Sequence, residues 1–163
     1  WCSKDLPKKG LDFILDIWKK IHLCNKNTVL LVVGATRNSP MDGVQFFGKI
    51  PNQELPKYYQ MADCYLFPTL CHEGFGLSLI EALHCGCYCI ASSMGGVPEV
   101  LQYGKLGKLI ENPHFQQEWE AAILDFLNQK EGNNIVIPKT LYSTQSWNSG
   151  MNTIIENAKN RMQ

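Results

Sequence analysis

The sequence lacks an excess of charge of either sign. Lys plus Arg and Asp plus Glu each total 15 of the 163 residues, so the formal net charge at pH 7 is zero. A general nucleic-acid-binding surface needs a basic excess, so we expect no nucleic-acid partner. No apolar run approaches the roughly 18 residues that a membrane span requires, so the sequence predicts no transmembrane helix.

Common metal and nucleotide motifs are also missing. None of the seven cysteines forms a Cys-x-x-Cys pair, and Cys85, Cys87 and Cys89 lie two residues apart. This spacing does not match a zinc site, and buried thiols in a reducing cytosol are the better interpretation. The chain contains no G-x-G-x-x-G, no Gly-Lys-Ser/Thr and no Asp-x-Asp. We therefore expect neither a dinucleotide fingerprint nor a P-loop.

Apolar runs and helical stripes alternate along the chain. TVLLVVG (28–34) is a continuous apolar run that ends in glycine, as is typical of a strand buried on both faces of a parallel sheet. Leu11, Ile14 and Trp18 recur at helical spacing. The alternation predicts an α/β fold with a Rossmann-like doubly wound parallel sheet, which binds ligands beyond the carboxyl ends of its strands. The expected strands are 28–34, 44–48, 63–68, 87–92 and 107–110.

Helices are expected between these strands and at the end of the chain. Asn52 is a candidate N-cap for a helix within 51–62. In the helix within 113–129, we expect Phe115, Trp119, Ile123 and Phe126 on one side. A last, polar helix is expected over 146–161.

The stretch HEGFGLSLIEALHCG (72–86) carries the candidate chemistry. A loop after an expected strand leads through a Gly-Phe-Gly turn into a helix that spans about 77–85. The first amides of a helix have no internal partners and attract anions such as a diphosphate. Glu73 would repel that anion and therefore suits sugar hydroxyls, whereas Glu81 could reach a ribose. Two alternatives stay open: Ser78 and Glu81 form a capping-box pattern, and Glu73 alone is an ordinary loop acid.

The first ten residues add a cluster of cations. Lys4, Lys8 and Lys9 lie in SKDLPKKG, before the first expected helix. Two or three cations near a helix opening would neutralise a diphosphate. A solvated lysine cluster is the alternative for any short charge run.

Together these segments resemble a known family. EGFGLSLIEAL is similar to the E-x7-E signature of group 1 glycosyltransferases, which are retaining, nucleotide-sugar-dependent enzymes of two-lobed GT-B architecture. KDLPKKG resembles the family's Arg-Leu-x-x-x-Lys-Gly loop. Further segments follow in the family's order and spacing, and the resemblance extends from Lys4 to about Trp147. These segments are VVGA, FFGKIPNQELPKYYQMAD, CGCYCIASSMGGVPEVL and GKLGKLI.

The resemblance implies a role for each matching position. Glu73 would contact the donor sugar, Lys9 and Lys4 the diphosphate, and Glu81 the ribose. Lys4 stands where the family usually has arginine, and lysine lacks the planar bidentate fork. The remaining donor-binding positions are the amides of Phe75, Gly76 and Leu77, Gly34 near the nucleotide, and Gly48, Lys49 and Ile50 beside the base. The resemblance implies no metal and no cofactor.

The resemblance also implies a domain organisation. Residues 1–146 would be the C-terminal donor-binding lobe and 147–163 the crossover helix, with the N-terminal acceptor lobe outside the chain. The donor would be a UDP- or GDP-sugar and the acceptor a polysaccharide or lipid-linked glycan hydroxyl. The full-length protein would be cytoplasmic and could associate peripherally with the inner face of the cytoplasmic membrane. The chain alone would bind a donor without completing transfer. The alternatives are a nucleotide-sugar 2-epimerase and a non-catalytic nucleotide-binding module.

Overall fold

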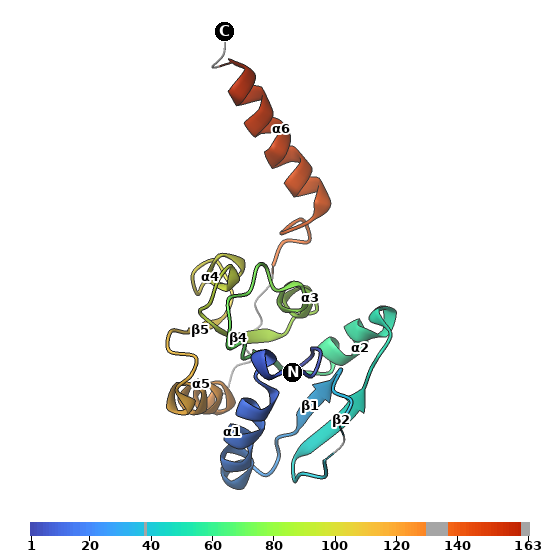
Figure 1. The fold of residues 1–163 in the computed structure, drawn as a ribbon, viewed down its shortest axis with the longest axis vertical. Helices are drawn as coiled ribbons and strands as arrows, with labels where there is room; N and C mark the ends of the chain where they lie inside the picture. The colour runs from blue at the N-terminus through green and yellow to red at the C-terminus, as the bar shows by residue number, and fades with distance from the viewer. Residues whose placement is uncertain (38, 130–136, 161–163) are drawn as a thin grey trace.

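The computed structural model describes residues 1–37, 39–129 and 137–160. Strands and helices alternate along the chain, as the sequence predicts (Figure 1). The strands are β1 (Leu30–Val33), β2 (Val44–Gly48), β3 (Cys64–Phe67), β4 (Tyr88–Ser92) and β5 (Lys108–Ile110). The α-helices are α1 (Leu11–Cys24), α2 (Leu55–Gln60), α3 (Leu77–His84), α4 (Val97–Val100), α5 (Gln116–Asn128) and α6 (Thr144–Asn160). The short 3₁₀ helices are η1 (Pro7–Lys9) and η2 (Asn52–Glu54).

All paired strands are parallel, but they form two separate sheets rather than one continuous sheet. β1 pairs with β2, and β3, β4 and β5 pair in that order. The first residues of the chain lie between the two sheets. Cys2 forms an isolated bridge with Val33 of β1, and its carbonyl accepts a hydrogen bond from the Tyr65 hydroxyl of β3 at 2.9 Å. Because this segment makes only an isolated bridge, no backbone ladder joins β1 to β3 within the described residues.

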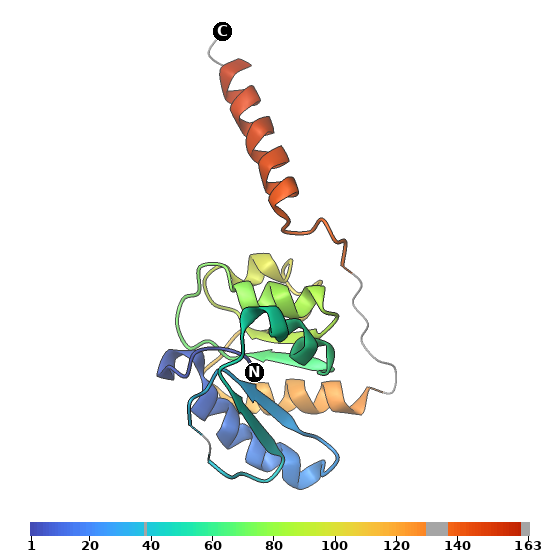
Figure 2. The same ribbon diagram turned by 90° about the vertical axis from the view of Figure 1, so that its right-hand side faces the viewer.

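Helices cover both faces of the strands, which confirms the doubly wound arrangement. Alternate strand residues serve two separate cores, because successive side chains of a strand point to opposite faces. Leu66 and Ile90 pack with α1 and α5, whereas Tyr65, Phe67 and Cys89 pack with the residues of α2, α3 and α4. Figure 2 shows α1 and α5 below β3 and β4, and α2, α3 and α4 above these strands.

Three local expectations are wrong. Asn52 lies inside η2 and makes no capping bond, because the chain turns at Pro51 instead. Phe115 is exposed at the N-cap of α5, while Trp119 and Ile123 are buried. Cys24 is exposed at the end of α1 rather than buried. The other described elements lie within a few residues of their predicted bounds.

Helix α6 extends away from the body of the molecule (Figures 1 and 2). It begins at Thr144, three residues before the predicted domain boundary. Its apolar residues Trp147, Ile154 and Ile155 are exposed. Within the described ranges, no helix combines the length and apolar character that crossing a membrane requires.

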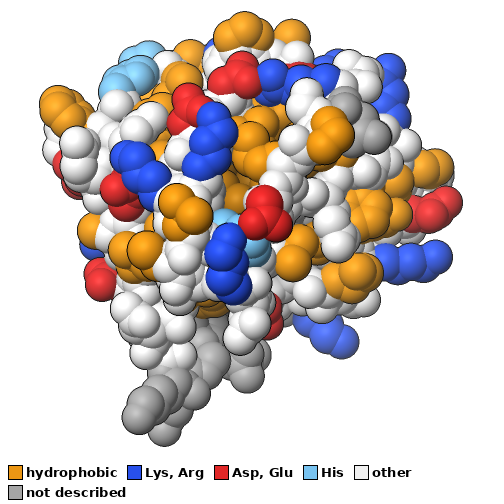
Figure 3. All heavy atoms as spheres, turned by 90° about the horizontal axis from the view of Figure 1, so that it is seen from below, with side chains coloured by type: hydrophobic (Ala, Val, Ile, Leu, Met, Phe, Trp, Pro, Cys, Tyr) orange, Lys and Arg blue, Asp and Glu red, His pale blue; other side chains and the backbone are white. Residues whose placement is uncertain are grey.

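The face at the lower end of Figure 1 mixes acidic and basic side chains (Figure 3). Lys20 of α1 pairs with Glu120 of α5 at 2.5 Å. Asp42, in the turn before β2, pairs with Lys26 at 3.1 Å and lies 3.4 Å from the Nε2 atom of His22. Exposed ion pairs of this kind contribute little to stability, so this face owes its packing to the apolar residues beneath it.

We expect Trp119→Ala to lower the free energy of unfolding by about 3–5 kcal/mol. Trp119 is fully buried, and its indole N–H donates to the Pro113 carbonyl. Its ring meets that of Phe13 edge-on, with the ring centroids 6.4 Å apart. Trp147→Ala is the matched control, because Trp147 is 65% exposed and its loss should cost below about 1 kcal/mol. Urea unfolding measures both, and equal effects would contradict the assigned core.

Candidate functional site

Two loops meet at the carboxyl ends of the strands. The amide of Leu70, in the β3–α3 loop, donates to the carbonyl of Lys8 in η1 at 2.9 Å. Gly10 follows η1 with φ +70°, and a Cβ there would lie 2.1 Å from the Pro68 carbonyl oxygen. Only glycine permits this conformation and approach. The loop of cations is thereby fixed against the loop that carries Glu73.

Lys9 and Glu73 form an ion pair across this junction. The Nζ and Oε2 atoms are 2.5 Å apart, and each side chain is only 21% exposed. The Lys9 carbonyl accepts a hydrogen bond from the indole N–H of Trp1 at 3.0 Å. The Glu73 carbonyl accepts one from the amide of Gly96 at 2.8 Å. Both charges therefore extend from backbone that is hydrogen-bonded to buried or neighbouring segments.

The β4–α4 loop supports the β3–α3 loop from behind. A Cβ on Gly95 would lie 2.2 Å from the Glu73 carbonyl oxygen, and a Cβ on Gly96 would lie 2.1 Å from that of Gly74. An isolated parallel bridge also joins Glu73 and Gly95. The two glycines allow this close approach, and the resulting contact holds the backbone of Glu73 in place beyond the ends of the strands.

Helix α3 begins with unpaired amides that face this junction. Gly76, with φ +74°, occupies the N-cap position, and a Cβ there would lie 3.3 Å from the Phe67 ring. The amides of Phe75, Gly76 and Leu77 have no hydrogen-bond acceptor among the described residues. Unpaired amides and the helix dipole together make this helix start attractive to an anion.

A cavity of about 410 Å³ lies over these groups. Gly74 is notable within it, because a Cβ at this position would meet nothing within 4 Å and its φ does not require glycine. Neither packing nor backbone conformation within the described residues therefore requires glycine at this position. The lining residues are Lys9, Phe67, Glu73, Gly74, Phe75, Gly76, Leu77 and Ser78.

The capping-box alternative for Ser78 and Glu81 is wrong. Because the helix begins at Leu77, Ser78 lies within its first turn, and no side chain caps the helix. Two tyrosine hydroxyls contact these side chains instead. The Tyr65 hydroxyl, whose one proton goes to the Cys2 carbonyl, lies 3.0 Å from Ser78 Oγ and can accept its proton, and the Tyr59 hydroxyl donates to Glu81 Oε2 at 3.2 Å. Burial raises the pKa of Tyr59, so its hydroxyl remains a donor. Glu81 is exposed and keeps acceptor capacity.

A comparison with known families assigns the chain. The model of the family described as glycosyl transferases group 1 matches residues 3–140. The chain belongs to this family. The match includes η1, the β3–α3 loop and all five described strands, so both halves of the ion pair lie within the region that defines the family.

Several curated proteins resemble parts of the chain. A GDP-mannose-dependent alpha-(1-6)-phosphatidylinositol monomannoside mannosyltransferase of Mycolicibacterium smegmatis is 29% identical over 126 residues, covering 67% of this chain and 33% of the relative. An N-acetyl-alpha-D-glucosaminyl L-malate synthase of Bacillus anthracis is 43% identical over 70 residues, covering 43% and 18%. The chain thus spans about a third or less of the length of these group 1 relatives.

Solved structures share the fold. HepE of Anabaena, crystallised with UDP, superposes with a TM-score of 0.69 at 21% identity and covers 82% of this chain and 39% of its own. The C-terminal domain of a group 1 glycosyl transferase, LpcC of Francisella tularensis, gives 0.67 at 21% identity, with 80% and 77% covered. The predicted Rossmann-like fold, of the kind found in GT-B glycosyltransferases, is confirmed.

The other positions that the group 1 resemblance singles out lie outside the cavity. Lys4 is exposed and its ammonium has no partner among the described residues. Gly34 and Gly48 lie together, because the Gly34 amide donates to the Gly48 carbonyl at 2.7 Å. Lys49 is exposed and Ile50 half-buried, directly after β2. These residues surround the strand ends without lining the cavity beside Lys9.

Sequence reasoning missed the side chains that hold the site in place. Arg37, after β1, lies 2.9 Å from Asp5 and donates to Asp12 at 2.6 Å, so it links β1 to the loop of cations and to α1. Trp1, which anchors Lys9, was likewise not predicted. These contacts join segments 8 to 32 residues apart, and no local motif signals them. The available signal was that these residues lie in loops that follow parallel strands, because such loops meet at one edge of a sheet.

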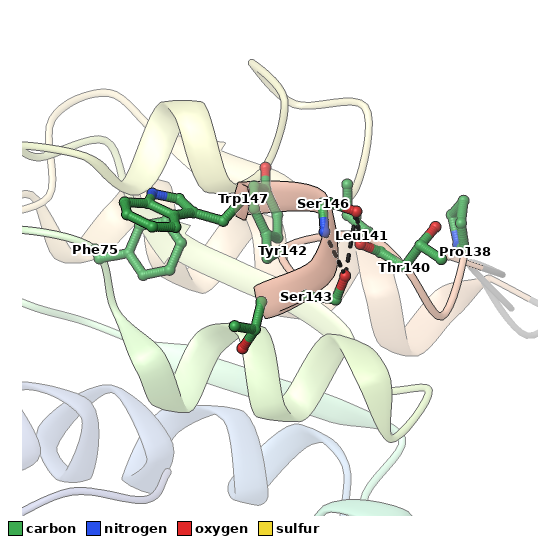
Figure 4. Close-up of a pocket in the computed structure, with 9 residues that line it drawn as sticks. Phe75, Pro138, Thr140, Leu141, Tyr142, Ser143, Ser146 and Trp147 are labelled. Atoms are coloured by element: carbon green, nitrogen blue, oxygen red, sulfur yellow. Dashed lines mark hydrogen bonds between the residues drawn. The ribbon is translucent and has the colours of Figure 1, made fainter. Parts of the chain in front are cut away.

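A second cavity, of about 670 Å³, adjoins the first at Phe75 (Figure 4). The Tyr142 ring meets the Phe75 ring edge-on at 5.6 Å, and the Tyr142 hydroxyl donates to the carbonyls of Glu99 and Val100. Leu141 is also tied to α3, because its carbonyl lies 2.9 Å from His84 Nε2. The segment before α6 is thus fastened over the E-G-F-G turn.

Two buried cysteines of the second core are unreactive thiols. Burial raises the pKa of Cys87 to about 11 and raises that of Cys89 well above its ordinary value, so these thiols stay protonated. In the part of the chain that the structure describes, no three His, Cys, Asp or Glu side chains converge to hold a metal ion.

We expect Gly76→Ala and Gly74→Ala to differ in stability although they lie two residues apart. Gly76→Ala should lower the free energy of unfolding by about 1–2 kcal/mol, because alanine is strained at positive φ and its Cβ approaches Phe67. Gly74→Ala should change it by less than about 0.5 kcal/mol. Thermal and urea unfolding of both variants test this, and a strongly destabilised Gly74→Ala would contradict an open position.

Proposed function

We propose that this chain is the nucleotide-sugar-binding domain of a retaining glycosyltransferase, which transfers a sugar from a nucleotide diphosphate to an acceptor hydroxyl. The observation that carries the proposal is the cavity in which Lys9, Glu73 and three unpaired amides converge at the start of α3. Membership of the group 1 family supports it. The site offers positive groups to a diphosphate and a carboxylate to hydroxyls, as a sugar diphosphate requires.

The proposed roles follow from charge and hydrogen-bonding capacity. The leaving diphosphate gains negative charge as the bond to the anomeric carbon breaks. Lys9 and the amides of Phe75, Gly76 and Leu77 stabilise that charge from fixed positions, and fixed donors cost no reorganisation during the reaction. Glu73 accepts hydrogen bonds from the sugar and Glu81 from the ribose. Lys4 adds longer-range attraction, and Gly34, Gly48, Lys49 and Ile50 border the nucleoside.

The acceptor binds elsewhere in the full protein. Because the chain spans about a third of the mannosyltransferase relative, a second lobe has room outside it. The LpcC C-terminal domain, which matches this chain over most of its length, supports assignment as a C-terminal lobe. We place the donor domain ahead of α6 and assign α6 (Thr144–Asn160) as the crossover helix, which moves the predicted boundary at 146/147 to the start of that helix. The proposed acceptor is a glycan or a lipid-linked glycan, as in polysaccharide assembly at the inner face of the cytoplasmic membrane.

The proposal includes no metal ion, because Lys9, Lys4 and the helix amides supply the positive charge that a diphosphate needs. A donor-binding isotherm that is the same with and without EDTA is the result this requires. Product analysis of the full protein separates the alternatives: a glycosylated acceptor supports a transferase, a free epimer supports an epimerase, and binding without turnover supports a non-catalytic module.

Gly74→Ala should weaken binding of a nucleotide sugar at least about tenfold, because the added methyl enters the space that the diphosphate needs. Calorimetry with UDP-glucose and GDP-mannose measures this and identifies the preferred base. Gly150→Ala is the matched control, since Gly150 lies on α6 with nothing within 4 Å of an added Cβ. Unchanged affinity in folded Gly74→Ala would contradict the site.

Glu81→Ala should weaken the binding of a nucleoside diphosphate about tenfold and leave the binding of inorganic pyrophosphate unchanged, because only the nucleoside carries a ribose. Glu156→Ala, a loss of one exposed acid on α6, controls for net charge. Competition calorimetry with UDP, GDP and pyrophosphate measures the three affinities. An equal loss for pyrophosphate would show that Glu81 does not act through ribose.

A further inference from the structure

The Lys9–Glu73 ion pair joins the two groups that the proposed function assigns to different parts of the ligand. The ammonium and carboxylate are in direct contact, and each side chain is about one-fifth exposed. Neither charged group has another hydrogen-bond or ion-pair partner among the described residues. Within the described protein, each charge therefore has the other as its compensation.

The surrounding backbone restricts how the pair can separate. Lys9 lies between the Trp1 indole and the turn at Gly10, and Glu73 lies against the β4–α4 loop. A diphosphate that reaches the three free amides also comes close to Lys9, since all of them line one cavity. As the lysine turns toward the phosphate oxygens, its single positive charge is shared between the phosphate and Glu73, so Glu73 keeps less of its compensation. A partly buried carboxylate without its cation is costly, and a nearby anion repels it.

Ligands differ in whether they compensate Glu73. A sugar nucleotide brings phosphate oxygens for Lys9 and hydroxyl donors for Glu73, so both members of the pair exchange one partner for another. A nucleoside diphosphate without sugar brings only the phosphate oxygens. It leaves Glu73 facing an anion with no donor.

We propose that the Lys9–Glu73 ion pair makes the site select the intact sugar donor over the free nucleoside diphosphate, and so promotes release of that product. The inference rests on the proposed function and adds a specificity role to its two charged residues. Before donor binds, the pair keeps the site compensated. After the sugar has left, Glu73 regains Lys9, and the product loses its strongest cation.

Glu73→Gln tests this because it removes the charge and nearly preserves the shape. Calorimetry compares UDP with UDP-glucose, and GDP with GDP-mannose, on wild type and variant. We expect the variant to bind the free nucleoside diphosphate about fivefold or more tightly, because Lys9 is released from its partner. Affinity for the sugar nucleotide should stay the same or fall, so the preference for donor over product should drop by at least about fivefold.

Two further variants complete the design. Lys9→Met should weaken the binding of the nucleoside diphosphate and of its sugar conjugate to a similar extent, because both ligands present phosphate oxygens. Glu111→Gln removes an exposed acid just after β5 that has no side-chain partner among the described residues, and it should alter neither affinity. A similar gain in Glu111→Gln would assign the effect to net charge and overturn the proposal.

The possible failures are distinguishable. If wild type binds the sugar nucleotide but Glu73→Gln binds the free nucleoside diphosphate no more tightly, the ion-pair proposal is overturned and the proposed function stands. If wild type binds neither ligand, the proposed function is overturned and the ion-pair proposal with it. A circular dichroism melt of each variant establishes that it is folded before binding is measured.

Discussion

The site depends on one backbone junction, the docking of the loop 6–10 against the β3–α3 loop. Gly10 packs on the Pro68 carbonyl, and the Leu70 amide donates to the Lys8 carbonyl. This junction places a lysine from the start of the chain beside a glutamate 64 residues later. Without it, Lys9 would be an exposed cation on a surface loop. With it, the start of α3 gains a fixed positive partner and its cavity gains two charges of opposite sign.

Opposite charges and unpaired amides give the cavity a dual chemistry. The helix start and Lys9 favour an anion, while Glu73 favours donors of hydrogen bonds. Within the ion pair, the charges of Lys9 and Glu73 compensate each other. A ligand that presents an anion next to hydroxyl groups satisfies both, which links the local electrostatics to the group 1 family and to a sugar diphosphate as the proposed ligand. The same balance would distinguish donor from product.

The sequence predicted the strands and the candidate motif well because both are local patterns. Short, mostly apolar runs identified all five described strands within a few residues, and the E-G-F-G turn identified the start of α3. Partners were not predictable in this way. The capping-box pattern at Ser78 failed because Gly76, in a left-handed conformation, is the N-cap two residues earlier. Tyrosines from β3 and α2 contact Ser78 and Glu81 instead. The division of the strands into two sheets was also not predictable, because it depends on pairing between segments that are distant in the sequence.

The roles of Glu73 and Glu81 as contacts to sugar and ribose stay predictions, as does that of Lys4, which is exposed near the site without lining its cavity. A crystal structure of the domain with a bound sugar nucleotide tests the central claim most directly. The account predicts Lys9 Nζ on the diphosphate, Glu73 on sugar hydroxyls and the amides of Phe75, Gly76 and Leu77 directed at phosphate or sugar oxygens. A nucleotide bound elsewhere, with Lys9 and Glu73 still paired, would contradict it.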